Sequence, residues 1–167
     1  ADSADIIITS GGVSEGEEDH VKAAVTTLGQ LDVWKLAIKP GKPLAFGRVK
    51  QTPFFGLPGN PASVLVTFMV MARPFLLALQ GCTNTNGHSL SAHLVNPPKK
   101  PSIRQEYLRV RLVPSAQAGL TLEAMTNQNS GVLTTAMKGD GLAVVKANTC
   151  GDQAQDVEFL PYASYGV

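Results

Sequence analysis

The pattern of apolar and polar positions divides the chain into two parts. In the first part, residues 4–9 form an apolar run without polar alternation, which is typical of a parallel strand covered on both faces. Residues 17–28 repeat apolar side chains at helical spacing and predict an amphipathic helix, with Gly29 as its C-terminal cap. Three shorter apolar runs predict further strands at residues 33–38, 43–48 and 53–57.

The longest apolar stretch of the chain, residues 62–79, predicts a buried helix. Asn60 is suited to its N-cap position and Pro61 to its first turn. Arg73 and Pro74 interrupt the stretch, which is also short for a membrane span, so no membrane association is expected. Strands alternating with helices in this order are typical of an α/β domain.

The second part of the chain consists of short strand candidates between loops. Asn, Thr, Gly, Pro, Ser and Lys dominate residues 83–89 and 96–102, which are predicted as loops or linkers. Strands are expected at residues 90–95, 105–113, 120–124, 141–146 and 156–160. We therefore predict an α/β domain over residues 1–82 and a small, barrel-like all-β domain over residues 88–167. Because the chain opens directly on an interior strand, the first domain is expected to lack its N-terminal part.

Composition and charge narrow the class of protein. The 167 residues are 44% hydrophobic, which is ordinary for a globular protein with a buried core. The net charge of +1 gives no broad basic surface, so nucleic acid is not an expected partner and a positive site must be local. Cys82 and Cys150 form neither a disulfide framework nor a zinc pattern, and two free thiols favour the reducing cytoplasm.

Three loops that follow apolar runs carry groups that bind anions. The first has the sequence TSGGVS, and it places Gly11 and Gly12 between a strand and a helix, where backbone N–H groups can approach a ligand closely. Ser10 and Ser14 add hydroxyl donors. Taken alone, this loop fits a tight turn between a strand and a helix equally well.

The second loop has the sequence KPGKP at residues 39–43. Two prolines stiffen it, and it presents Lys39 and Lys42 at the end of a strand. Lys35 lies four residues before Lys39 and is expected on the same face of an extended strand. Three ammonium groups in one place would bind a doubly charged oxyanion, and solvated surface lysines are the alternative interpretation.

The third loop has the sequence LPGNPAS at residues 57–63. It places Ser63 and the first amides after Asn60 at the N-terminus of a helix, which is a second anion-binding geometry. In an α/β fold the first and third loops would meet at the carboxyl edge of the sheet, where ligands normally bind. A capped helix without a ligand is the alternative.

Acidic residues beside the first loop are candidate metal ligands. Asp19, with Glu17 and Glu18, offers carboxylate oxygens to Mg²⁺, a hard cation that prefers oxygen ligands. The alternative is a solvated acidic first turn that complements the helix dipole.

The motifs as a set resemble one protein family. TSGGVS, KPGKP and LPGNPAS, in this order and spacing, closely resemble the third domain of the molybdopterin molybdenumtransferase family, which includes MoeA and the gephyrin E domain. Residues 88–167 resemble that family's fourth, all-β domain through the sequences RQEYLR and NQNS. The resemblance implies a three-layer, molybdopterin-binding-like α/β domain that is truncated at its N-terminus, without the family's first two domains.

The resemblance also implies a reaction and the residues that carry it. The family inserts molybdate into adenylylated molybdopterin and releases AMP with the help of Mg²⁺. Asp19 would act on Mg²⁺ and the adenylate, and residues 11–14 would hold the pterin phosphate. The implied catalytic residues are Asp19, Lys35, Lys39 and Lys42, and the implied oxyanion-binding residues are Ser10, Gly11, Gly12, Ser14, Ser63, Arg104 and Ser130.

The family works as a homodimer, so the resemblance implies a second copy of the chain as a partner, and a molybdopterin adenylyltransferase as another. Two other functions stay open. A molybdopterin adenylyltransferase shares the α/β fold and a TSGG-type loop, but the β domain and the pair of Pro-rich loops argue against it. A non-catalytic, gephyrin-like scaffold would bind peptides, and the sequence marks no peptide groove.

Overall fold

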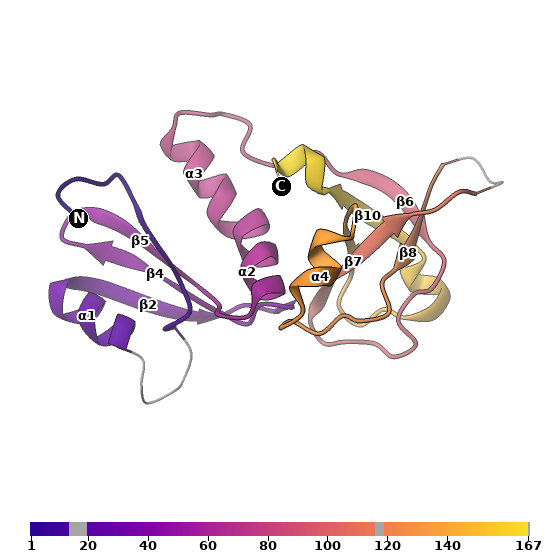
Figure 1. Cartoon of the computed structure of the whole chain (residues 1–167), viewed down its shortest axis with the longest axis horizontal. Coiled ribbons are helices and arrows are strands. Elements are labelled where there is room, and N and C mark those ends of the chain that lie inside the picture. Colours follow the sequence, from indigo (N-terminus) through magenta and orange to yellow (C-terminus); the bar gives the residue numbers. More distant parts are fainter. Residues whose placement is uncertain (14–19, 116–118, 167) are drawn as a thin grey trace.

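Two sheets divide the chain in the computed structural model, which describes residues 1–13, 20–115 and 119–166 (Figure 1). The first sheet has the order β1-β5-β4-β2. Its strands are β1 (Ile7–Ser10), β2 (Gly29–Lys35), β4 (Pro43–Val49) and β5 (Thr52–Leu57). Strand β1 is parallel to β5, whereas the other neighbouring pairs are antiparallel. We call this sheet and its helices the α/β unit.

Helices cover both faces of the first sheet. Helix α1 (His20–Leu28) packs Val25 into a cluster with Phe54 on one face. A long helix packs Ala72 into a cluster with Phe55 on the other face. Phe54 and Phe55 are neighbours in β5 and point to opposite faces, because successive side chains of a strand alternate. The predicted three-layer α/β fold is therefore confirmed.

The long helix after β5 changes geometry at its centre. It consists of α2 (Pro61–Thr67), the π-helical turn η1 (Phe68–Ala72) and α3 (Arg73–Leu79). Pro74 has no backbone N–H and cannot continue the α-helical bonding pattern, and the wider turn lies directly before it. The N–H of Arg73 accordingly donates to the carbonyl of Phe68, five residues back.

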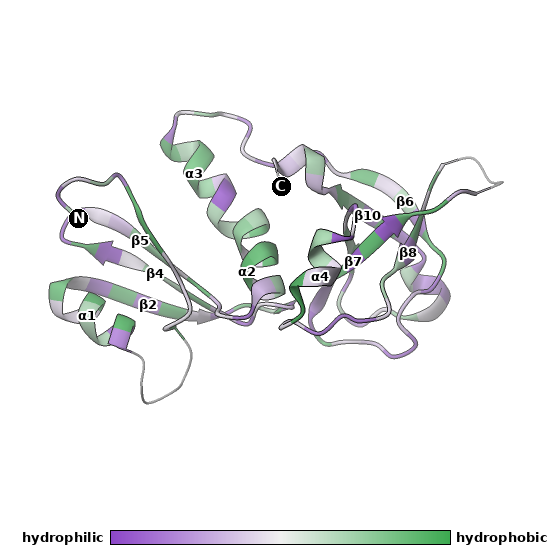
Figure 2. Ribbon diagram, viewed as in Figure 1, coloured by the Kyte–Doolittle hydropathy of each residue, from purple (hydrophilic) through white to green (hydrophobic). Residues whose placement is uncertain are grey.

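The same helix is only partly buried. By length and composition it could cross a membrane, a property that core helices of globular proteins share, and apolar residues dominate it (Figure 2). Val66 and Met69 are buried against the second sheet. No residue of α3 is buried, so the predicted burial is wrong for that half. Edge contacts of the Phe75 ring with Phe46 nevertheless hold α3 on the first sheet.

Three predictions about the first sheet are wrong, because the pairing of its strands determines where each strand begins, ends and is covered. Strand β1 is shorter than residues 4–9 and lies at the sheet edge, so Ile8 is 39% exposed rather than covered. Residues 33–38 do not form one strand, because β2 starts earlier and ends at Lys35. Gly29 therefore begins a strand instead of capping α1, and a Cβ there would lie 1.9 Å from the Arg48 carbonyl oxygen.

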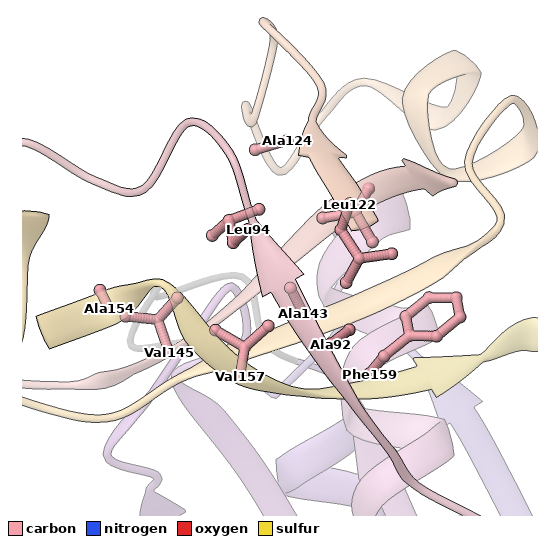
Figure 3. Packing of buried hydrophobic residues seen from close by; sticks show 10 residues of the cluster. Ala92, Leu94, Leu122, Ala124, Ala143, Val145, Ala154, Val157 and Phe159 are labelled. Atoms are coloured by element: carbon pink, nitrogen blue, oxygen red, sulfur yellow. The ribbon is translucent and has the colours of Figure 1, made fainter. Parts of the chain in front are cut away.

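The second sheet closes into a five-stranded barrel. Its strands are β6 (Leu90–Leu94), β7 (Gln105–Leu112), β8 (Leu120–Ala124), β9 (Gly141–Val145) and β10 (Asp156–Pro161). They pair in the order β7-β8-β6-β10-β9, and β9 pairs again with β7. The interior is filled by apolar side chains from alternate positions, among them Leu94, Leu122 and Phe159 (Figure 3). The predicted barrel-like all-β fold is confirmed.

A two-residue strand, β3 (Ile38–Lys39), joins the α/β unit to the barrel. It lies parallel to β7 at the start of that strand, where Lys39 pairs with Glu106. The chain thus leaves the first sheet at Lys35, touches the barrel at β3 and returns to the first sheet at Pro43. The KPGKP loop consequently lies at the junction of the two units. Helix α4 (Leu133–Met137) and the 3-10 turns η2 (Gly151–Ala154) and η3 (Tyr162–Tyr165) complete the fold.

Candidate functional site

The three predicted anion loops meet at one cavity between the α/β unit and the barrel. This cavity, which we call the anion cavity, has a volume of about 660 Å³. The α/β unit and β3 contribute all three loops. The barrel contributes Arg104, which directly precedes β7, and residues 128–130 of the loop at residues 127–130. The predicted site residues that line it are Gly11, Gly12, Lys39, Lys42, Ser63, Arg104 and Ser130.

Two predicted site residues within the described part of the chain, Ser10 and Lys35, are not among its lining residues. The Ser10 hydroxyl donates to the Pro58 carbonyl at 3.3 Å and so ties the first loop to the third. Lys35 ends β2, and it does not share a strand face with Lys39, because the chain changes sheets between them. That part of the prediction is wrong. Asp19 and Ser14 lie outside the described residues.

The first and third loops pass each other backbone to backbone. Gly11 and Gly12 have φ values of +82° and +71°, which favour glycine. A Cβ on Gly59 would lie 3.5 Å from the Gly11 Cα. The Gly11 N–H donates to the Leu57 carbonyl at 3.0 Å, so this predicted donor is used within the protein. The glycines therefore allow two loops to approach closely beside the cavity.

The start of α2 is held by the barrel. Asn60 occupies the N-cap position, but its side chain makes no capping bond; its Nδ2 instead donates to the Ser130 Oγ at 3.2 Å. The Ala62 N–H donates to the Ser130 carbonyl at 3.0 Å, and Pro61 has no N–H to offer. Of the amides expected to bind an anion here, that of Ala62 is therefore already used within the protein. Ser63 itself lines the cavity.

Glu106 is a cavity neighbour that sequence reasoning missed. Its carboxylate accepts a hydrogen bond from the Lys39 ammonium at 2.7 Å, and the side chains are 7% and 52% exposed, respectively. This ion pair fixes the direction of Lys39 and offsets its charge. The pairing of β3 with β7 brings Glu106 next to Lys39, and the sequence pattern does not reveal that pairing.

The other charged side chains that the structure describes around the anion cavity are positive. Arg104 is half-buried and donates from Nη1 to the Ile38 carbonyl at 3.3 Å, which aligns its guanidinium with β3. Lys42 is exposed at the other end of the KPGKP loop. Counted over the described residues alone, Lys39, Lys42 and Arg104, less the Glu106 carboxylate, leave two net positive charges around the cavity. Such a site matches a doubly charged oxyanion in charge and in donor type.

Metal-binding groups are scarce in the described part of the chain. Residues 1–13, 20–115 and 119–166 contain no cluster of three or more His, Cys, Asp or Glu side chains that could hold a metal ion. The sequence prediction of a Mg²⁺ site therefore depends on Asp19, which lies outside this part.

Two family descriptions match the chain. Residues 1–78 match the family described as "Probable molybdopterin binding domain", and residues 91–162 match "MoeA C-terminal region (domain IV)". A molybdopterin molybdenumtransferase of Haemophilus influenzae is 56% identical over 78 residues, which are 47% of this chain and 19% of that protein. The molybdenum cofactor synthesis protein cinnamon of Drosophila melanogaster is 35% identical over 148 residues, which are 87% of this chain and 24% of that protein.

Solved structures agree with these matches. The crystal structure of a molybdopterin biosynthesis MoeA protein from Pyrococcus horikosii superposes with a TM-score of 0.72 at 28% identity, covering 96% of this chain and 38% of that chain. Both units are therefore similar to known structures over nearly their whole length. The chain spans 19%, 24% and 38% of the length of these three relatives.

Proposed function

Given that this chain belongs to the MoeA family, we propose that it supplies the oxyanion-binding part of a molybdopterin molybdenumtransferase. The proposed reaction inserts molybdate into adenylylated molybdopterin and releases AMP. The observation that carries this proposal is the anion cavity, in which Lys42, Arg104, Ser63 and Ser130 converge from two units. The adenylyltransferase alternative is not favoured, because relatives that match this chain are named molybdopterin molybdenumtransferase.

The residues of the cavity suit this chemistry. Molybdate and a phosphate ester are tetrahedral oxyanions that accept hydrogen bonds from ammonium, guanidinium and hydroxyl groups. Lys42 and Arg104 neutralise charge, and the hydroxyls of Ser63 and Ser130 orient the oxygens. Release of AMP breaks a bond to phosphorus, and such reactions are accelerated mainly by positioning and by stabilisation of charge on the phosphoryl oxygens. The cavity supplies both from groups that the fold holds in place.

Mg²⁺ is a further part of the proposal. Mg²⁺ usually binds one or two carboxylates, substrate phosphate oxygens and water. The described residues supply no metal cluster, so the ion would depend on Asp19 together with the adenylate phosphate.

We also propose a homodimer in the cytoplasm that receives its adenylylated pterin from a molybdopterin adenylyltransferase. Exposed apolar side chains such as Trp34 (50%) and Met137 (75%) provide surface for association. Cys82 and Cys150 are free thiols, in keeping with a reducing compartment. Size-exclusion chromatography with light scattering tests the dimer, and the expected result is twice the mass of one chain.

Titration calorimetry of molybdate into the 167-residue chain tests the anion site. A charged hydrogen bond contributes about 1.5–3 kcal/mol, so Lys42→Met and Arg104→Met should each weaken molybdate binding by about 10-fold to 100-fold. Lys146→Met is the matched control, because Lys146 is exposed and is not among the residues that line the anion cavity. Wild-type affinity in Lys42→Met and Arg104→Met would exclude the cavity as the oxyanion site.

AMP release tests the transfer itself. The chain is joined to the parts of a full-length relative that it lacks and is supplied with adenylylated molybdopterin, molybdate and Mg²⁺. The fusion should release AMP, and Arg104→Met should abolish release. A fusion that binds peptides but neither molybdate nor the adenylate would instead support the scaffold function.

A further inference from the structure

Arg109 is the largest fully buried side chain of the described residues, although it carries a charge. It lies in the middle of β7, and its guanidinium is 0% exposed. Burial lowers the pKa of Arg109, and the neighbouring Tyr162 opposes that change. Among residues 1–13, 20–115 and 119–166, no carboxylate forms an ion pair with it. A buried charge without a counter-ion is unfavourable unless polar groups surround it, so its surroundings should reveal its role.

The guanidinium instead binds backbone carbonyls of the loop at residues 127–130. Its Nη2 donates to the Asn127 carbonyl at 3.3 Å and to the Asn129 carbonyl at 3.1 Å. Its Nε donates to the Thr135 hydroxyl at 3.3 Å. A planar guanidinium can hold several acceptors in a fixed arrangement, whereas an ammonium group cannot.

The backbone of Arg109 binds the same loop. Its N–H donates to the Gln128 Oε1 at 3.0 Å, and the Gln128 Nε2 donates back to its carbonyl at 2.8 Å. The residue therefore holds the 127–130 loop both from its side chain and from its main chain. Within the loop, the Asn129 Oδ1 accepts a hydrogen bond from the Gly131 N–H at 2.9 Å.

This loop forms the barrel side of the anion cavity. Gln128, Asn129 and Ser130 line the cavity. Ser130 in turn binds the start of α2, because its carbonyl accepts the Ala62 N–H and its hydroxyl accepts the Asn60 amide. A path of hydrogen bonds thus leads from the buried guanidinium, through the loop, to the helix that carries the opposite wall.

Stability alone does not account for an arginine at this position. Its Nη1 has no hydrogen-bond partner among the described residues, and neither does the buried hydroxyl of Tyr162. An unsatisfied buried donor weakens a fold, and apolar residues of similar volume often replace buried charges without loss of stability. A buried charge that lowers stability in this way is expected mainly at functional sites.

We propose that Arg109 is a positioning residue of the anion site. By fixing the carbonyls of Asn127 and Asn129, it sets the position of Ser130, which connects the barrel wall of the cavity to the start of α2. The expected effect of Arg109 on ligand affinity rests on the proposed oxyanion-binding function. Its role in holding the loop at residues 127–130 does not depend on that function.

The test uses the full 167-residue chain with Arg109→Met and Arg109→Lys. Arg111→Met is the matched control, because Arg111 lies two residues further along β7, is exposed and also donates to a carbonyl, that of Lys138. Amide hydrogen exchange is measured at Ala62 and Gly131, with the amides of β9 and β10 as internal references. Molybdate affinity is measured by calorimetry.

In Arg109→Met, exchange at Ala62 and Gly131 should become at least 10-fold faster, exchange in the barrel strands should stay unchanged, and molybdate should bind at least 10-fold more weakly. Arg109→Lys should show a smaller increase in exchange at Ala62 and Gly131 and a smaller loss of molybdate affinity. Arg111→Met should show neither change. If Arg109→Met does not fold, Arg109→Lys decides the question by the same two readouts.

Two outcomes would overturn the proposal. One is a folded Arg109 variant with wild-type exchange at Ala62. The other is faster exchange at Ala62 with wild-type molybdate affinity, which would make the loop irrelevant to the site. Failure of the proposed function looks different: the wild-type chain would not bind molybdate at all, while the exchange data would still report whether Arg109 holds the loop.

Discussion

Gly41→Ala should destabilise the α/β unit, because Gly41 occupies a backbone conformation and a space that only glycine suits. Its φ is +103°, a value that residues with a Cβ rarely adopt. A Cβ there would also lie 2.5 Å from the Thr67 Oγ1 and 3.5 Å from the Ser63 carbonyl oxygen. Gly41 thus lets the KPGKP loop rest directly on α2 beside the anion cavity.

The size of the effect follows from two contributions. Placing an L-residue at positive φ costs about 1–2 kcal/mol. The contact with Thr67, a residue that is fully buried, adds about 1–3 kcal/mol, the usual range for an overpacked site. Gly81→Ala measures the first contribution alone, because Gly81 has a φ of +82° and a Cβ there would meet nothing within 4 Å.

Urea unfolding is followed by the fluorescence of Trp34, the only tryptophan, which lies in the α/β unit and stacks on Phe46. Gly41→Ala should lower the free energy of unfolding by about 2–5 kcal/mol and Gly81→Ala by about 1–2 kcal/mol. With a urea m-value of about 2 kcal/mol/M, the midpoint of Gly41→Ala should fall by about 1–2.5 M.

A double-mutant cycle isolates the contact. Thr67→Ala removes the hydroxyl that the new methyl group would meet, so the second substitution should recover about 1–3 kcal/mol in the Gly41→Ala background relative to its effect alone. Equal losses in Gly41→Ala and Gly81→Ala, with no coupling to Thr67, would refute the argument that the loop is pressed against α2.

Three further predictions address the site, the barrel and pH. Ser10→Ala should leave molybdate affinity within about twofold, because Ser10 is not among the residues that line the cavity and its hydroxyl is bonded to the Pro58 carbonyl. That hydrogen bond contributes only about 0.5–1.5 kcal/mol to stability. A loss of tenfold or more in calorimetry would place Ser10 on the ligand. Phe159→Ala should lower the stability of the barrel by about 3–5 kcal/mol, because the ring is 1% exposed within the closed core. Far-UV circular dichroism should then be lost at a lower urea concentration than in the wild type, and an unchanged midpoint would contradict this prediction. Burial raises the pKa of Tyr162 to about 12, against an ordinary 10, so between these pH values the unfolded chain has lost a proton that the folded chain keeps. Tyr162 should therefore contribute a fall in stability of about 1.4 kcal/mol per pH unit over that window. Tyr162→Phe should remove about 3 kcal/mol of the alkaline loss of stability. Identical alkaline stability profiles of variant and wild type would refute this prediction.

The amino-acid pattern by itself determined most of the local structure. The five barrel strands lie within two residues of their predicted bounds, because alternation of apolar and polar side chains is a property of neighbouring residues along one strand. The helix that starts at Pro61 was equally visible, since Asn60 and Pro61 mark its N-terminus. The glycine, proline and lysine loops were recognisable as anion-binding candidates, because their chemistry is local.

Tertiary structure decided which of these groups meet. Residues 33–38 split between two sheets because β3 pairs with β7, and the same pairing places Glu106 against Lys39 and leaves Lys35 outside the cavity lining. Arg109 and Arg111 stand at alternate positions of β7, yet the loop at residues 127–130 covers Arg109 and leaves Arg111 exposed. Strand pairing and the burial of a side chain by a distant loop depend on residues far apart in the chain. A periodic pattern of hydrophobicity does not specify which distant segment packs against a given strand.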